Sequence, residues 1–304
     1  MTDGYLTTPD GVRLFFETRG TGREVVLFPS GFHLADDFTY LADGRTLVFY
    51  DPRNRGRSDA VADEAKLARG VLHDAEDVEA VRRHFGVETV ALVGHSYVGL
   101  MIILYAIAHP ERVTRVVQLS PMEPFPGKQY PGHLTHADDV LSNALRRLEQ
   151  LQADGERLPA RELCRLFWSV MRPIYVADPA DADKITWDRC DLPNEVNFMT
   201  HWMGRVLPSL HRLGLTPEQI AKAAMPVLTV HGRKDRSAPY GGAREWAMLL
   251  PDARLLTVDR AAHAPWLEAP DEVRGPVEMF LGGTWPPVAH RVVSLDPEDQ
   301  AGSA

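Results

Sequence analysis

Short runs of apolar and β-branched residues alternate with amphipathic segments along most of the chain. This alternation is typical of βαβ units, so we expect an α/β protein with a mostly parallel, doubly wound sheet. The expected strands are residues 5–8, 12–18, 24–29, 46–50, 89–93, 113–119, 227–231 and 254–259. Pro9-Asp10-Gly11 is a good turn sequence, and it predicts that the first two strands form a hairpin.

Four helical patterns lie between or after these strands. Residues 72–85 are apolar at Val78, Val81 and Phe85 and are followed by Gly86, which predicts an amphipathic helix that ends there. Residues 96–109 are apolar almost all round, as expected of a helix that is buried on every side. Residues 240–250 and 271–281 predict two more helices.

Residues 121–216 interrupt the alternation. They have helical patterns at 139–153, 161–172 and 196–213 but no convincing strand, and the strand pattern resumes at Met225. We therefore expect a helical insertion between two strands of one sheet. The core would comprise residues 1–120 and 217–283, and residues 284–304 would form a loose C-terminal tail.

Composition limits the partners of the chain. It has 304 residues, 44% hydrophobic and 25% charged, with a formal net charge of −9 and no basic run interleaved with aromatics, so neither nucleic acid nor an anionic membrane is expected as a partner. The N-terminal residues do not resemble a secretory signal, and we expect a cytoplasmic location. The two cysteines, Cys164 and Cys190, allow at most one disulfide, and we expect both to be packing thiols in a reducing compartment.

Ser96 is the strongest candidate for a nucleophile. It follows an apolar strand in Gly94-His95-Ser96-Tyr97-Val98-Gly99 and directly precedes an apolar helix. A serine between strand and helix lies on a tight turn that exposes its hydroxyl, and the following helix directs N–H groups towards developing negative charge. The alternative interpretation is an ordinary helix N-cap.

A base and an acid for this serine lie at the ends of later strands. Asp235 follows the strand at 227–231, and His263 follows the strand at 254–259. The three residues occur in the order Ser, Asp, His, each beyond the carboxyl end of a strand, where open α/β sheets place their ligands. Asp259 is an alternative acid because it is close to His263 in the sequence.

These motifs resemble those of the α/β-hydrolase superfamily over nearly the whole chain. Gly94-His95-Ser96 is similar to the nucleophile elbow, residues 231–235 to the acid loop, and residues 262–268 to the base loop. Residues 50–58 are similar to the family's Asp-x-Arg-Gly-x-Gly-x-Ser loop. The resemblance is greatest to the proline iminopeptidase-like branch, and it implies that residues 121–216 form a helical cap over the site.

The resemblance implies an oxyanion hole with two departures from the family pattern. One donor would be the backbone N–H of Tyr97, and the other that of Gly31 or Phe32, which we leave open. The family's His-Gly pair is replaced here by Pro29-Ser30-Gly31-Phe32, and Val98 replaces a small residue of the elbow. Backbone donors tolerate such side-chain changes.

Other histidines have weaker claims to function. His133 and His136 form His-x-x-His without further ligands nearby, so we propose no metal site there and expect no cofactor. We expect His95 to be a packed neighbour of the nucleophile rather than a second base.

The aromatic residues of the expected cap indicate what kind of substrate the site binds. We expect Trp168 and Trp202 to line an apolar substrate pocket. An aminopeptidase would need a carboxylate for the substrate's ammonium group, and Asp191 and Glu195 are the candidates. We rank an esterase of small carboxylic esters first, a proline iminopeptidase-like aminopeptidase second and a non-catalytic binder of a small ligand third; the oligomeric state is left open.

Overall fold

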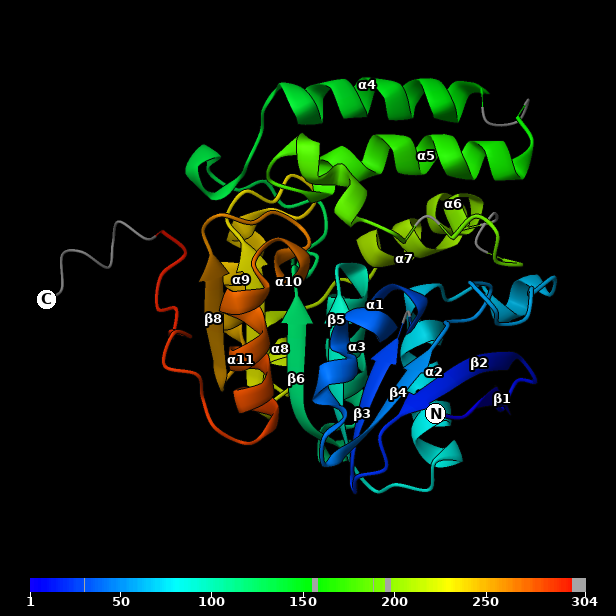
Figure 1. Ribbon diagram of the computed structural model, residues 1–304, viewed down its shortest axis with the longest axis vertical. Helices are drawn as coiled ribbons and strands as arrows, with labels where there is room; N and C mark the ends of the chain where they lie inside the picture. The colour runs from blue at the N-terminus through cyan, green and yellow to red at the C-terminus, as the bar shows by residue number, and fades with distance from the viewer. Residues whose placement is uncertain (30, 155–157, 188, 195–197, 297–304) are drawn as a thin grey trace, which may run out of the picture.

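The computed structural model describes residues 1–29, 31–154, 158–187, 189–194 and 198–296. Its sheet has eight strands in the order β1-β2-β4-β3-β5-β6-β7-β8, in which β1 and β2 are antiparallel to their neighbours and the others are parallel (Figure 1). The strands are β1 Asp3–Thr7, β2 Arg13–Arg19, β3 Glu24–Pro29, β4 Arg45–Tyr50, β5 Val90–His95, β6 Val113–Leu119, β7 Val227–Gly232 and β8 Ala253–Val258. The expected hairpin and mostly parallel sheet are confirmed.

Helices cover both faces of this sheet. The core helices are α1 Gly31–Phe38, α2 Val71–His84, α3 Tyr97–Ala108, α8 Pro217–Ile220, α9 Tyr240–Leu249, α10 Pro265–Glu268 and α11 Pro270–Leu281. α2, α3 and α9 pack on one face, and α1 and α11 pack on the other, which is the nearer face in Figure 1.

The sheet has a hydrophobic core on each face, because side chains along a strand point alternately to one face and the other. Successive strand side chains point to opposite faces, so Leu27 and Leu92 contribute to the cluster under α2 and α3, whereas Phe28 and Val93 contribute to the cluster under α1 and α11. Because both faces are covered, β5 and β7 are buried along their whole length. The helix α3 is also buried at most positions, as its apolar sequence predicted.

The described part of residues 121–216 forms the layer above the carboxyl ends of the strands in Figure 1. Its helices are α4 Asp139–Asp154, α5 Ala160–Tyr175, α6 Phe198–His201 and α7 Leu207–His211. A π-helical turn, Trp202–Val206, separates the last two where the sequence predicted one helix. Pro208 has no N–H to donate to residue 204, and the backbone N–H of Leu207 bonds instead to Trp202, five residues back.

The C-terminal segment differs from the loose tail that we expected. Residues 284–296 run back along the core: Leu255 and His290 form a bridge, and Ala289 and Val292 are buried. Arg244 of α9 donates to the carbonyl of Leu295 at 2.7 Å. The sequence analysis undervalued these scattered apolar residues because they follow no helical or strand period.

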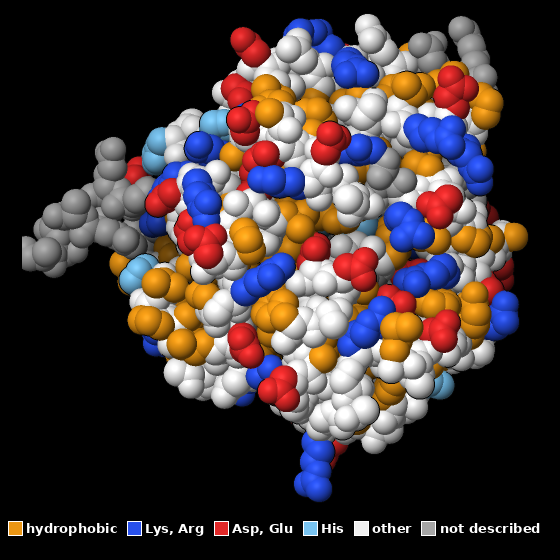
Figure 2. All heavy atoms as spheres, viewed as in Figure 1, with side chains coloured by type: hydrophobic (Ala, Val, Ile, Leu, Met, Phe, Trp, Pro, Cys, Tyr) orange, Lys and Arg blue, Asp and Glu red, His pale blue; other side chains and the backbone are white. Residues whose placement is uncertain are grey.

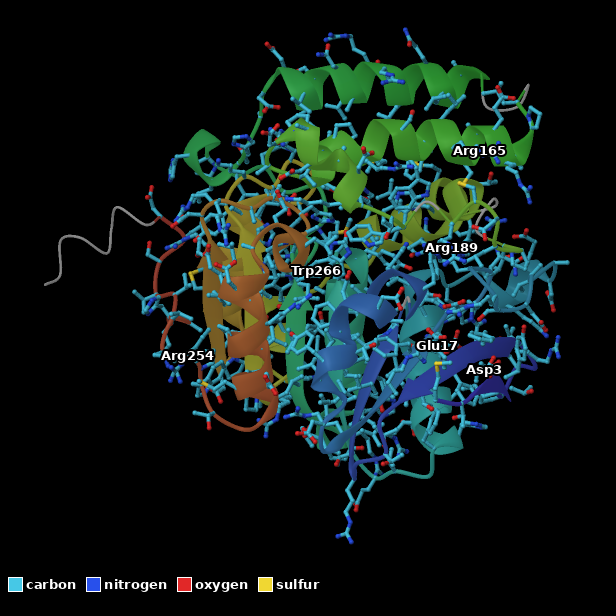
Figure 3. The ribbon with its side chains drawn as sticks, in the orientation of Figure 1. Asp3, Glu17, Arg165, Arg189, Arg254 and Trp266 are labelled. Carbon is cyan, nitrogen blue, oxygen red and sulfur yellow. A yellow bond between two sulfur atoms is a disulfide. The ribbon has the colours of Figure 1, made fainter. Side chains whose placement is uncertain are left out.

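The expectation of two packing thiols is also wrong. Cys164 of α5 and Cys190 form a disulfide, with their Cα atoms 6.0 Å apart (Figure 3). The two residues are 26 positions apart, and their approach depends on how the chain returns beneath α5. This long-range packing of the cap cannot be read from cysteine spacing.

One face of the molecule is mixed in charge. On the face shown in Figure 2, acidic, basic and hydrophobic side chains are interspersed, with no extended field of one sign. Among the described residues, no helix combines the length and apolar character that a membrane crossing requires.

Candidate active site

Ser96 lies on a strained turn between β5 and α3. Its backbone has φ 58° and ψ −127°, a left-handed conformation that is rare for a residue with a side chain. The turn is tight: a Cβ atom on Gly94 would lie 2.8 Å from the carbonyl oxygen of Val98. Val98 itself is buried in the core. The strand-to-helix turn that the sequence predicted is therefore present.

Asp235 follows β7 and is almost fully buried with every side-chain oxygen occupied. Its Oδ1 accepts the backbone N–H groups of Ser237 and Ala238 at 2.7 and 2.9 Å. Its Oδ2 lies 2.7 Å from Nδ1 of His263. Burial acts to raise the pKa of Asp235, but the nearby His263 and the bonds from His231 and His263 outweigh it and hold the pKa below its usual range.

His263 is fully buried and oriented by Asp235. Because the carboxylate accepts from Nδ1, the neutral ring presents Nε2 as a base. This Nε2 atom has no hydrogen-bond partner among the described residues. The ring packs 4.5 Å, centroid to centroid, from His95, the residue before Ser96, so the base lies against the elbow.

His231 is a second histidine on the acid, and the sequence analysis missed it. Its side chain is fully buried, and its Nε2 lies 3.1 Å from the carbonyl oxygen of Ala238 and 3.3 Å from Oδ2 of Asp235. Both neighbours are acceptors, so Nε2 carries a proton and helps to fix the carboxylate. Its position four residues before Asp235, at the end of the same strand, was the available signal.

His95 has the packing role that we expected. Its Nε2 donates to the backbone carbonyl of His263 at 3.1 Å. Burial, followed by the neighbouring His263 ring, lowers the pKa of His95 well below its ordinary value. Trp266, labelled in Figure 3, packs on its other side at 4.8 Å.

The loop at residues 50–58 contributes a buried cation to the site. Asp51 is fully buried and bonded by the Arg57 side chain at 2.8 Å, and Gly56 is in a left-handed conformation beside it. These contacts fold the loop so that Arg55 reaches the elbow, where its Nη1 donates to the hydroxyl of Tyr97 at 3.3 Å. The sequence motif predicted the loop but not the contact of Arg55 with Tyr97.

The residues of the expected oxyanion hole lie at two helix N-termini. Tyr97 is the first residue of α3, and Gly31 and Phe32 are the first two residues of α1. Amides in the first turn of a helix have no partner within the helix and attract negative charge. The helix α1 was not expected, because Pro29-Ser30-Gly31 looked like a loop.

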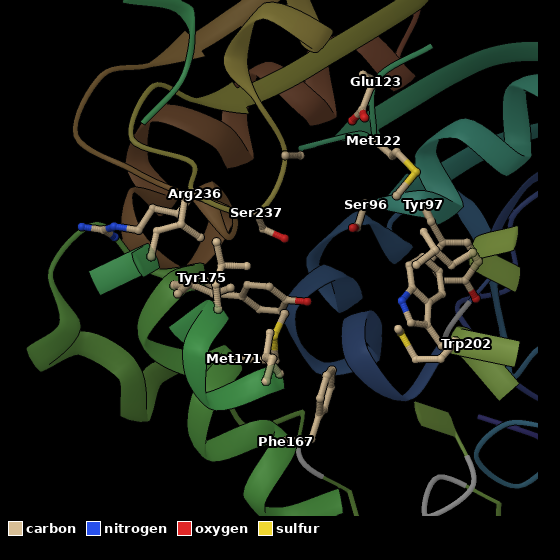
Figure 4. Close-up of a pocket in the computed structure, with 17 residues that line it drawn as sticks. Ser96, Tyr97, Met122, Glu123, Phe167, Met171, Tyr175, Trp202, Arg236 and Ser237 are labelled. Carbon is tan, nitrogen blue, oxygen red and sulfur yellow. The ribbon is translucent and has the colours of Figure 1, made fainter. Parts of the chain in front are cut away.

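A large cavity opens above Ser96. It has a volume of about 460 Å³, within the usual range for small-molecule sites, and is framed by α4, α5 and the π-helical turn (Figure 4). Its apolar walls include Leu141, Leu145 and Leu148 on one face of α4 and Phe167, Met171 and Ile174 on α5. Trp202, expected as a pocket residue, lines this cavity and packs 5.0 Å from the Tyr97 ring.

A small cavity adjoins Ser96 on another side. Its volume is about 50 Å³, and its walls include His33, Leu34, Arg55, Val98, Trp168 and Trp187. Trp168, the second expected pocket residue, lies here and is 4% exposed. The disulfide is one turn before Trp168 on α5 and three residues after Trp187, so it links the two tryptophan walls.

Three further acidic residues were candidates for the site: Glu195 and Asp191 for binding a substrate ammonium group, and Asp259 as an alternative acid. Glu195 lies outside the described residues. Asp191 is exposed and paired with Arg189 at 3.2 Å, away from both cavities. Asp259 is exposed and paired with Arg233 at 2.8 Å, which excludes it as the partner of His263.

Known proteins resemble this chain over most of its length. The model of the alpha/beta hydrolase fold family matches residues 25–270. A bifunctional esterase/perhydrolase of Acinetobacter calcoaceticus is 28% identical over 88% of this chain and 95% of its own. A proline iminopeptidase of Saccharolobus solfataricus is 22% identical over 89% of each chain. The structure of a thermophilic esterase from Thermogutta terrifontis superposes with a TM-score of 0.69 at 18% identity, covering 93% of this chain and 99% of that one.

Proposed function

Because the chain belongs to the alpha/beta hydrolase fold family, we propose that it is a serine hydrolase of small carboxylic esters, with Ser96 as nucleophile, His263 as base and Asp235 as acid. One observation carries the proposal: His263 is bonded to Asp235 at 2.7 Å, its Nε2 has no hydrogen-bond partner among the described residues, and its ring packs 4.5 Å from that of His95, the residue before Ser96. This is the base–orienter arrangement that activates a serine hydroxyl. The apolar walls of the large cavity favour an ester with an apolar substituent.

The chemistry proceeds through an acyl-enzyme. His263 takes the Ser96 proton as the hydroxyl oxygen attacks the ester carbonyl, and Asp235 stabilises the imidazolium that forms. The N–H of Tyr97 and that of Gly31 or Phe32 bind the oxyanion, each contributing about 3–4 kcal/mol to lowering the barrier. His263 then protonates the leaving alcohol, and a water molecule repeats the cycle on the acyl-enzyme. No cofactor takes part.

An aminopeptidase of the proline iminopeptidase type is the second candidate function. The carboxylate of Glu123, which the sequence analysis did not single out, lines the large cavity together with Ser96. Such a group could pair with the ammonium of a free N-terminal residue. The similarity to the proline iminopeptidase of Saccharolobus solfataricus is the other support for this candidate.

Hydrolysis of p-nitrophenyl esters of increasing acyl length, measured beside proline naphthylamide, separates the two candidates. We expect ester hydrolysis to dominate and to disappear in Ser96→Ala. Efficient cleavage of the amide, lost in Glu123→Gln or Glu195→Gln, would establish the aminopeptidase instead. Absence of covalent labelling by a fluorophosphonate would favour the third function, a binder without catalysis.

The proposal includes a small-molecule substrate. The cytoplasmic location expected from two reduced thiols loses that support, because Cys164 and Cys190 form a disulfide and disulfides are usual in oxidising compartments.

A further inference from the structure

Tyr175 lies where the two cavities meet. Ser96, Tyr97 and Tyr175 are the residues that line both of them. The first two belong to the elbow of the core, whereas Tyr175 is the last residue of α5 in the cap. Figure 4 shows its hydroxyl directed into the large cavity, towards the space in front of Ser96. The cap therefore places one aromatic ring at the boundary between the cavities.

The backbone around Tyr175 is bound to the acid and base loops. We call residues 175–177 the descending segment. The carbonyl of Tyr175 accepts the backbone N–H of His263 at 3.1 Å, and the carbonyl of Val176 accepts from Arg236 at 2.6 Å. The N–H of Ala177 donates to Glu268 at 2.6 Å. The ring of Tyr175 also packs 4.6 Å from the ring of His263, so it has little freedom to move away.

Arg236 also fixes the start of α4. Its side chain is 4% exposed, and it donates to Asp138, the residue before α4, at 2.8 Å. Both cap helices that wall the large cavity are thus joined to the residue after Asp235. The boundary at Tyr175 is consequently a rigid feature of the site.

The two cavities differ in volume by roughly ninefold, about 460 against about 50 Å³. An ester has two substituents, one on each side of the carboxyl group, and Ser96 stands between the cavities. The small cavity is walled by the rings of Trp168, Trp187 and Tyr175 and has a volume of only about 50 Å³, whereas Leu145 at the wall of the large cavity is 51% exposed. A long substituent therefore fits in one direction only.

We propose that Tyr175 is a specificity-determining residue that divides the site, so that the protein selects esters with one short and one long apolar substituent. This inference rests on the proposed serine hydrolase function. A misplaced methylene in such a pocket costs about 1–3 kcal/mol, or about 10–200-fold in kcat/KM. The selection should consequently be large enough to measure with simple substrates.

Isomeric esters test the proposal at constant composition and hydrophobicity. Hexyl acetate and methyl heptanoate each carry one short group, whereas their isomer butyl butanoate carries two of intermediate length. We expect one of the first pair to exceed butyl butanoate in kcat/KM by at least about tenfold. We call this ratio the isomer preference. Equal rates for butyl butanoate and the better of the pair would overturn the proposal.

Variants of Tyr175 test whether its ring causes the isomer preference. Tyr175→Ala joins the cavities and should reduce the isomer preference to about twofold or less, through faster turnover of butyl butanoate relative to its isomers. Tyr175→Phe keeps the ring and should keep the preference. A preference that survives in Tyr175→Ala would overturn the role of Tyr175. If the Ala variant fails to fold, as judged by its Tm, Tyr175→Leu replaces it.

The two levels of the proposal fail separately. If wild-type protein is neither labelled by a fluorophosphonate nor able to hydrolyse any of the three isomers, the serine hydrolase proposal is wrong, and the division of the site fails with it. If labelling and hydrolysis are lost in Ser96→Ala but the isomer preference is absent, only the division by Tyr175 is wrong.

Discussion

The sheet edge and the cap are built by different kinds of contact. At the sheet edge, by which we mean the carboxyl ends of the parallel strands, Asp235 and His263 follow the neighbouring strands β7 and β8. Asp235 is held there by hydrogen bonds from the backbone of Ser237 and from His263. In the cap, apolar faces of α4 and α5 enclose the large cavity, and a disulfide and the descending segment hold its walls. From this difference we propose that the sheet edge supplies the chemistry and the cap supplies the selection.

The largest expected effect is at the nucleophile. Ser96→Ala should lower kcat/KM for esters by about 10⁵-fold or more, because the attacking oxygen is removed while the binding cavities remain. Ester hydrolysis followed by titration of released acid measures this loss, and an unchanged Tm serves as the folding control. Substantial remaining turnover in the purified variant would place the chemistry elsewhere.

Asp235→Asn should lower turnover by about 10⁴-fold, since the amide cannot accept from Nδ1 in the same way and favours the wrong tautomer of His263. Asp259→Asn is the matched control because Asp259 is exposed and makes its ion pair with Arg233. We expect the control to retain wild-type kinetics. Comparable losses in the two variants would contradict the assignment of the acid.

Removal of the disulfide should affect the cap far more than the chemistry. Cys164→Ser with Cys190→Ser should lower the free energy of unfolding by about 3 kcal/mol, as expected for a closed loop of this size. Chemical denaturation of the two forms measures this change. The isomer preference should also fall, because the bond joins the walls at Trp168 and Trp187. Fluorophosphonate labelling of Ser96 should persist, and its loss would refute the separation of the two regions.

Asp74, in the core at the start of α2, should make stability depend on pH. Burial, followed by repulsion from Asp77, raises the pKa of Asp74 to about 7. The folded protein then binds this proton more tightly than the unfolded chain, whose carboxyl titrates near about 3.9. The free energy of unfolding should fall as the pH rises from about 4 to about 7, by about 2–4 kcal/mol.

Urea unfolding at pH 5 and pH 8 measures this dependence. Asp74→Asn should reduce the decline but not abolish it, because burial also raises the pKa of Asp77 to about 6. The isomer preference should be unchanged because Asp74 lines neither cavity. A decline of equal size in the variant would assign the effect to other groups.

The smallest expected effect is that of Arg236, which follows Asp235 at the sheet edge and binds the cap. Arg236→Gln should lower the isomer preference by about tenfold at most, because loss of the bonds to Asp138 and the descending segment lets Tyr175 move. Arg233→Gln, three residues earlier and exposed, is the matched control and should change nothing. Kinetics of the three isomeric esters decide between them, and an unaltered preference in Arg236→Gln would show that the descending segment needs no such support.

The sequence alone was sufficient where local pattern and strand order determine position. The run of strand patterns along the chain predicted the sheet. Successive side chains of a strand point to opposite faces, so the place of a residue in the strand gives the face on which it lies. The strand order also predicted that Asp235 and His263 lie close together, because parallel strands bring their carboxyl ends to one edge of the sheet, and the two side chains are 2.7 Å apart. The catalytic role of Ser96 with these two residues stays a prediction. The helix α1 escaped notice because its apolar residues are too few to form a clear period.

The tertiary structure alone decided everything that depends on contacts between distant segments. Arg55 and Glu123 have no distinctive local signal, and His231 has only its place four residues before Asp235. The surroundings of each side chain are set by distant segments of the chain. The pairing of Cys164 with Cys190 and the unequal cavities beside Tyr175 arise from the packing of the cap on the core. Such packing is collective, because each wall of a cavity is positioned by residues far away in the chain.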